Sequence, residues 1–148
     1  MKLKTLELPK SSFLSVDKDL SIICDKILKN KRLQKYLYYN VENPLEQEDL
    51  ISQEVRDMFG KYIRIVPKLD ISGEVMNYII VSCDNFVPNA SNPEFRDNVI
   101  EFDIICHFDQ WQMKDFELRP YKIAGELDFM LDGNRLTGIG TLEFLGAS

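Results

Sequence analysis

Four side chains that can bind a divalent cation alternate along one stretch of this sequence. Glu101, Asp103, His107 and Asp109 stand at even spacings within Val99–Asp109, so they would share one face of a β-strand. Carboxylate oxygens and one imidazole nitrogen are ligands that such a cation accepts. A metal-dependent nuclease or hydrolase is therefore one hypothesis for this face.

The same spacing argues against a metal centre. The row would span roughly 26 Å from Glu101 to Asp109 at about 3.3 Å per residue, whereas metal ligands must surround one point. His107 is the only histidine in the chain, which excludes sites that need two imidazoles. We therefore expect Glu101, Asp103 and Asp109 to form an acidic surface, and we expect no catalytic activity, no metal and no cofactor.

The other positions of this stretch are apolar and would form the opposite, core-facing side of the strand. These positions are Ile100, Phe102, Ile104, Cys106 and Phe108. A strand divided in this way is typical of an antiparallel sheet that packs helices on one face and leaves the other face open.

Other period-two patterns predict strands over residues 62–66, 75–86 and 136–145, beside the one over 99–109. Apolar residues at helical spacing predict one helix from Ser15 or Asp17 to Asn30, a shorter one around residues 33–37, and one from Pro120 to Gly133. The expected fold class is α/β of the α+β type: a mostly antiparallel four-stranded sheet packed by helices on one face.

Residues 1–14 are predicted to be an N-terminal arm, because three leucines suit an extended, partner-docking segment that ends at Pro9. Residues 15–148 are predicted to be a single α/β domain, which their length allows.

Two loops are the predicted contact elements. Residues 87–98 contain several prolines and asparagines, and residues 110–118 follow the acidic strand. Aromatic residues in or beside such loops are candidate interface anchors. The candidates are Phe86 and Phe95 for the first loop and Trp111 and Phe116 for the second.

The formal net charge of −6, from 18 basic and 24 acidic residues, disfavours nucleic-acid binding, which depends on neutralising phosphates with Lys and Arg. No apolar run approaches the roughly 20 residues that cross a bilayer, so we expect no membrane partner. The three cysteines show no CxxC spacing of the kind that zinc and redox sites use.

Several runs of residues resemble tail-completion and tail-terminator proteins of tailed bacteriophages. The runs are LKNKRLQKYL at 28–37, IEFDIICHFDQW at 100–111, LRPYKI at 118–123, LDG at 131–133 and a final Gly-x-Gly-x-Leu strand. The resemblance extends over most of residues 16–146.

This resemblance implies a structural virion protein of the phage neck and tail. It implies a hexameric ring that ends the tail tube and joins it to a head connector or adaptor protein, made in the host cytoplasm and located in the virion. DNA would pass through such an acidic ring without specific binding. A third hypothesis, beside this one and the metal-dependent hydrolase, is a host adaptor that binds a protein through a sheet edge or an apolar loop.

Overall fold

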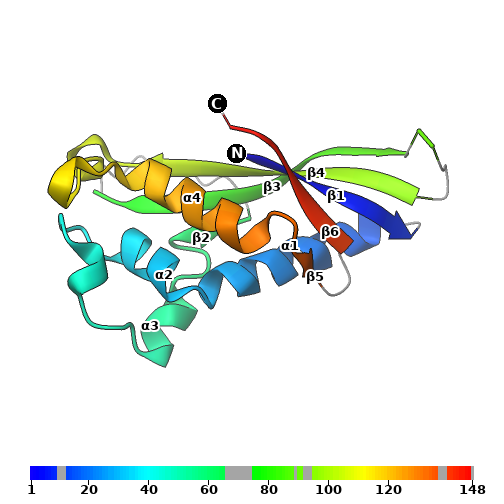
Figure 1. Ribbon diagram of the computed structural model, residues 1–148. Helices are drawn as coiled ribbons and strands as arrows, with labels where there is room; N and C mark the ends of the chain where they lie inside the picture. Colours follow the sequence, from blue (N-terminus) through cyan, green and yellow to red (C-terminus); the bar gives the residue numbers. More distant parts are fainter. Residues whose placement is uncertain (10–12, 66–74, 89, 92–94, 137–139, 148) are drawn as a thin grey trace.

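The computed structural model describes residues 1–9, 13–65, 75–88, 90, 91, 95–136 and 140–147. In it, helices cover one face of a six-stranded sheet (Figure 1). The helices are α1 (Phe13–Leu28), α2 (Lys31–Tyr38), α3 (Ser52–Asp57) and α4 (Arg119–Leu131), with 3₁₀ turns η1 (Pro44–Glu46), η2 (Phe108–Gln110) and η3 (Lys114–Phe116). The strands are β1 (Lys2–Pro9), β2 (Ile63–Arg64), β3 (Asn77–Pro88), β4 (Phe95–Cys106), β5 (Arg135–Leu136) and β6 (Gly140–Gly146). The α+β class is confirmed.

The strand order is β2-β3-β4-β1-β6-β5, in which only β2 and β3 run parallel. The sheet is therefore mostly antiparallel, as predicted, but the predicted number of four strands is wrong. The strand predicted over residues 62–66 is β2, of which two residues pair in the sheet. One strand that was not predicted is β5, which contains two residues, too few to show a period of two. Another, β1, comes from the segment that was expected to stand apart from the sheet.

Of the predicted arm over residues 1–14, residues 2–9 form a strand of the sheet and residues 13 and 14 begin a helix, while residues 10–12 lie outside the described residues. Strand β1 lies between β4 and β6 and pairs with both. At its start, the amino group of Met1 donates a hydrogen bond to the carbonyl of Phe102 at 3.1 Å. A short apolar segment does not reveal from its own sequence that partners about 100 and 140 residues away complete its hydrogen bonds.

The long hairpin of β3 and β4 replaces much of the predicted loop over residues 87–98. Strand β3 continues to Pro88 and β4 begins at Phe95. At the other end, β4 stops at Cys106 and not at Asp109, because His107 begins the η2 turn. The predicted alternation holds over 100–106, where Ile100 and Phe102 are buried and Asp103 is exposed.

Helices α1, α2 and α4 lie on the same face of the sheet (Figure 1). Their apolar stripes meet β3, β4 and β6 in one core, which includes Ile23, Leu37, Ile79, Phe102 and Leu127. Helix α1 begins at Phe13, before the predicted caps Ser15 and Asp17.

Asn30 begins α2 rather than ending α1. Its side-chain oxygen accepts hydrogen bonds from the backbone N–H groups of Arg32 and Leu33 at 3.0 and 3.1 Å. None of the described helices is long and apolar enough to cross a bilayer.

Helix α2 is tied to the segment that follows it by an exposed ion-pair cluster. Asp49 accepts from Lys31 at 2.6 Å and lies 2.9 Å from the ammonium of Lys35, which also donates to the carbonyl of Gln47 at 2.6 Å. Hydrogen bonds from Lys31 and then Lys35, with their positive charge, lower the pKa of the Asp49 carboxyl to about 2.

We predict that this cluster makes stability depend on pH in the acid range. The pKa of Asp49 is lower in the folded than in the unfolded chain, so its contribution is complete above about pH 4 and is lost as the pH falls toward 2. Asp49→Asn should flatten the pH dependence of the unfolding midpoint in that window. NMR titration of the Asp49 carboxyl checks the shift, and a carboxyl that titrates near pH 4 would contradict it.

Candidate functional site: an exposed aromatic end

Arg119, the first residue of α4, holds one end of the molecule together. Its side chain is fully buried and donates to four carbonyl oxygens: Gln110 at 2.8 Å, Tyr36 at 2.7 Å, Tyr39 at 3.0 Å and Val41 at 2.6 Å. Burial lowers the pKa of the guanidinium, but an arginine stays charged in proteins. One cation therefore fixes the end of α2, the segment after it and the η2 turn relative to α4.

The segment between β4 and α4 is built on this anchor. Trp111 donates from its indole nitrogen to the carbonyl of Cys106 at 2.9 Å, and its own carbonyl accepts from the N–H of Arg119 at 2.8 Å. His107 caps the turn, with Nδ1 accepting from the N–H of Asp109 at 3.3 Å. The loop over 107–118 is therefore fixed at several points along its length.

Two successive residues of this loop have left-handed backbone conformations. Asp115 has φ of 61° and Phe116 φ of 62°, a region that costs a residue with a side chain about 1 kcal/mol. Backbone hydrogen bonds beside the pair hold it in place. The N–H of Met113 donates to the carbonyl of Glu117 at 2.8 Å, and the N–H of Lys114 donates to the carbonyl of Glu42 at 2.9 Å. In this conformation the aromatic side chain of Phe116 points away from the protein and is 89% exposed.

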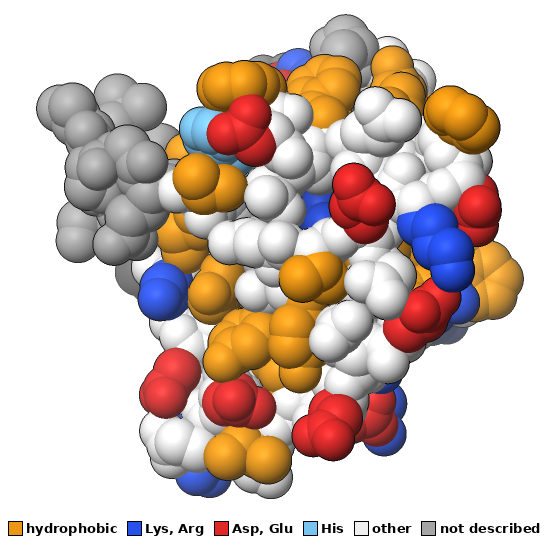
Figure 2. Space-filling view, turned by 90° about the vertical axis from the view of Figure 1, so that its left-hand side faces the viewer, with side chains coloured by type: hydrophobic (Ala, Val, Ile, Leu, Met, Phe, Trp, Pro, Cys, Tyr) orange, Lys and Arg blue, Asp and Glu red, His pale blue; other side chains and the backbone are white. Residues whose placement is uncertain are grey.

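Phe116 belongs to an apolar surface at this end, which we call the end surface. Its members are Phe108, Trp111, Phe116 and Leu118, which are 77%, 45%, 89% and 38% exposed. Figure 2 views the molecule from this end and shows hydrophobic side chains separated by acidic ones. Large apolar side chains that project into water together mark interaction sites in soluble proteins.

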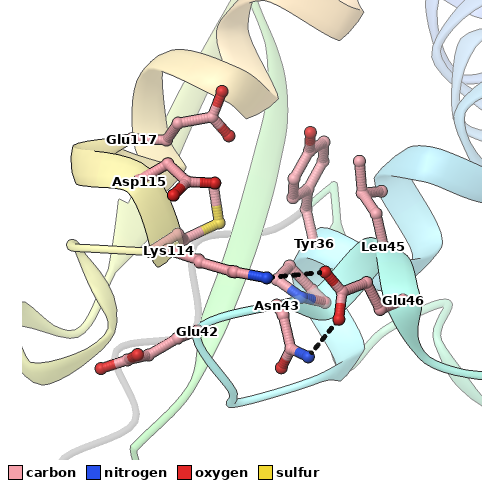
Figure 3. A pocket seen from close by; sticks show the side chains of 10 residues that line it. Tyr36, Glu42, Asn43, Leu45, Glu46, Lys114, Asp115 and Glu117 are labelled. Atoms are coloured by element: carbon pink, nitrogen blue, oxygen red, sulfur yellow. Dashed lines mark hydrogen bonds and ion pairs between the residues drawn. The ribbon is translucent and has the colours of Figure 1, made fainter.

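A small polar pocket lies beside the end surface, between η1 and η3 (Figure 3). Its volume is about 140 Å³. Lys114 reaches across it to Glu46, with 3.3 Å between Nζ and Oε1, and Asn43 donates to the same carboxylate at 2.8 Å. The Asn43 hydrogen bond, and then Lys114, lower the pKa of Glu46. Asn43, Glu46 and Lys114 thus bond to one another and form a polar border to the apolar surface, as interfaces commonly have.

The row of Glu101, Asp103, His107 and Asp109 is divided in the structure. Glu101 lies on β4, 3.5 Å from the ammonium of Lys2, which pairs more closely with Asp84 at 3.0 Å. Asp109 lies beyond the strand, 3.5 Å from His107. Among the residues that the structure describes, no three His, Cys, Asp or Glu side chains are placed to hold a metal ion.

The predicted interface residues have different positions. Trp111 and Phe116 lie in the same loop and are both exposed. Phe86 and Phe95 lie in β3 and β4 and not in a loop, paired in register with Asn98 and Pro9, and their side chains are outside the described part of the structure. Asp103 is exposed and Glu101 is half-buried.

Two important residues were not predicted. Phe108 was assigned to the core face, but it is exposed because the strand has already ended. Arg119 was not singled out, and its only signal in the sequence is weak: an arginine directly before the proline that starts a helix.

The fold and this end define a small α+β protein with an exposed aromatic surface. Comparison with known families then gives a specific relationship, because the YomW family model matches residues 30–148. The chain belongs to the YomW family. YomW is the name of a gene product of an SPBc2-type phage, which makes this a phage-related protein. No curated protein and no solved structure matches the chain.

Proposed function

We propose that this chain is a structural protein of the phage neck and tail that assembles through the end surface. The observation that carries the proposal is Phe116, an aromatic side chain 89% exposed on a backbone held in a strained conformation. Strain of this kind persists where the surrounding bonds enforce it and is concentrated at functional positions. An exposed phenylalanine gains stability only when a partner covers it.

In the proposal, the partner at the end surface is a neighbouring copy in a closed, hexameric ring of the tail-terminator kind. A ring requires two different patches that meet head to tail. The end surface supplies one of them, with Phe116 and Trp111 as anchors and the polar pocket as its border. The second patch lies on another side of the neighbouring copy.

The charge of the chain fits a ring through which DNA passes. Six copies would carry six times the −6 of a single chain, and an acidic wall repels phosphates. Glu101, Asp103 and Asp109 contribute to that charge, and in this proposal they have no catalytic role. The further partners are the tail-tube protein and the head connector, and the assembled protein is located in the virion after synthesis in the host cytoplasm.

Electron microscopy of the purified chain, alone and mixed with tail tubes of its own phage, tests this proposal. We expect rings, and a ring-shaped cap at one end of each tube. Particles that remain single copies under both conditions would refute it.

Calorimetry separates the proposal from the metal-dependent hydrolase hypothesis. We expect no saturable heat of binding with Mg²⁺, Mn²⁺ or Zn²⁺. Saturable binding that Asp103→Ala abolishes would favour the enzyme. Asp57→Ala, which removes a carboxylate from α3, is the control.

A further inference from the structure

A hollow with an apolar lining lies between α1 and the end of α4. Its apolar side chains are Ile22 of α1, Met130 of α4 and Leu136 of β5. Its volume is about 540 Å³, whereas a cavity of about 150 Å³ is enough to hold a benzene ring. This hollow, which we call the α1–α4 groove, therefore has room for an aromatic side chain and part of a second one.

The rim of the groove on the side of α1 is basic. Lys26 and Lys29 both line it, and they stand four and seven positions after Ile22, so all three share one face of the helix. Lys29 pairs with Asp25 at 2.6 Å, but both side chains are more than half exposed, so this pair is weak. Lys26 has no ion pair among the residues that the structure describes. The lining as a whole carries net positive charge.

The end surface has the opposite charge around its most exposed side chain. Phe116 stands between Asp115 and Glu117, and all three residues are exposed. Glu117 pairs at 2.6 Å with Lys122 of its own chain, in a pair about half exposed, while Asp115 has no ion pair within the described residues. Any site that takes up the ring of Phe116 must therefore accept carboxylates at its edge. An apolar lining with lysines at its rim meets that requirement.

The two surfaces lie at opposite ends of α4 (Figure 1). The η3 turn that carries Phe116 comes just before Arg119, the first residue of α4, whereas Met130 is near its end. These ends are roughly 16 Å apart along the helix at about 1.5 Å per residue. Because Arg119 fixes the loop to the start of the helix, the chain cannot fill the groove with its own Phe116. The occupant has to come from another molecule.

We propose that the α1–α4 groove takes up Phe116 of a neighbouring copy, with Asp115 of that copy beside Lys26. This inference rests on the proposed ring and supplies its second patch. Each copy inserts its end surface into one neighbour and receives the end surface of another, which is the head-to-tail contact that a ring requires. The contact is small, so we expect a dissociation constant of about 10–100 μM for a single contact, and closure of the ring stabilises the assembly.

Two variants that each lack one half of the contact test it directly. Phe116→Gly removes the inserted side chain but keeps the groove, and Ile22→Asp places a carboxylate in the groove but keeps Phe116. In sedimentation velocity up to about 300 μM, each alone should associate at least about 30-fold more weakly than the unaltered chain. An equal mixture should form a dimer with one copy of each, which cannot grow further because only one intact contact is possible.

A charge exchange tests the position of Asp115 without changing an apolar side chain. Lys26→Glu, added to the Phe116→Gly chain, should weaken the mixed dimer about tenfold. Asp115→Lys in the partner chain should then restore the affinity to within about threefold. Lys61→Glu, which reverses an exposed lysine after α3, is the control and should change the affinity less than twofold. A charge exchange that restores nothing would overturn the placement of Asp115 beside Lys26.

The groove and the ring can fail separately. Thermal unfolding first shows that each variant is folded, and Lys26→Glu replaces Ile22→Asp as the groove variant if the latter unfolds. Rings that form normally from the groove variant but are lost in Phe116→Gly would overturn the groove as the receiving site and leave the ring standing. An unaltered chain that stays a single copy under all conditions would overturn the ring, and the lack of a mixed dimer would overturn the groove with it.

Discussion

Arg119→Met is expected to lower the free energy of unfolding by about 3–5 kcal/mol. Methionine fills a similar space but donates no hydrogen bond, so the carbonyls of Tyr36, Tyr39, Val41 and Gln110 lose the donor that they share. Polar groups left unsatisfied in the interior cost more than the net value of the bonds they made. Denaturant unfolding measures the change.

Two further substitutions show that the effect comes from hydrogen bonding at this position. Arg119→Lys keeps the charge, but one ammonium cannot reproduce the spread of the guanidinium donors, so it should recover less than half of the loss. Arg135→Met removes an exposed arginine on β5 and should change stability by less than about 0.5 kcal/mol. An Arg119→Met chain as stable as the Arg135→Met chain would contradict the anchoring role.

Phe116→Gly is expected to prevent assembly and to leave the isolated chain as stable as before or slightly more stable. Glycine adopts φ of 62° without a steric penalty, so removing the side chain relieves strain of up to about 1 kcal/mol. The same change removes an exposed aromatic anchor, which should cost about 2 kcal/mol, or roughly 30-fold in affinity, at each contact between copies. Native mass spectrometry and thermal unfolding measure the two effects independently.

The opposite directions of these effects make the prediction specific. A residue that only supports the fold would lose stability and assembly together. Ile51→Gly, which removes an apolar side chain that is 64% exposed at a distant position before α3, is the control and should leave assembly unchanged. Normal assembly of Phe116→Gly would show that the copies do not meet through the end surface.

Local patterns in the sequence predicted the local features of this fold. The alternation from Ile100 to Cys106 gave the buried face of β4, and Pro120 with the apolar stripe after it gave α4, because each pattern is complete within one element. The central position of β1 was not predictable, since its partners are distant in the chain. Strand β5, with two residues, was too short to recognise, whereas β2 lies within the strand predicted over residues 62–66.

The candidate site was predictable only in part for the same reason. Trp111 and Phe116 stood out as aromatic residues in a polar loop, and the structure places both on the end surface. The role of Arg119 depends on carbonyls from residues 36–41, about 80 positions away. The left-handed conformations of Asp115 and Phe116 depend on bonds to segments such as the one at Glu42. No pattern within residues 107–118 contains that information.

Trp111 shows directly whether another copy covers the end surface. It is the only tryptophan in the chain and is 45% exposed, so its fluorescence and its quenching by acrylamide report on this surface alone. We expect quenching to fall and the emission to move to shorter wavelength as the protein concentration rises through the assembly transition, and we expect Phe116→Gly to abolish both changes. Quenching that stays constant over the whole concentration range, whether or not the mass increases, would contradict this expectation.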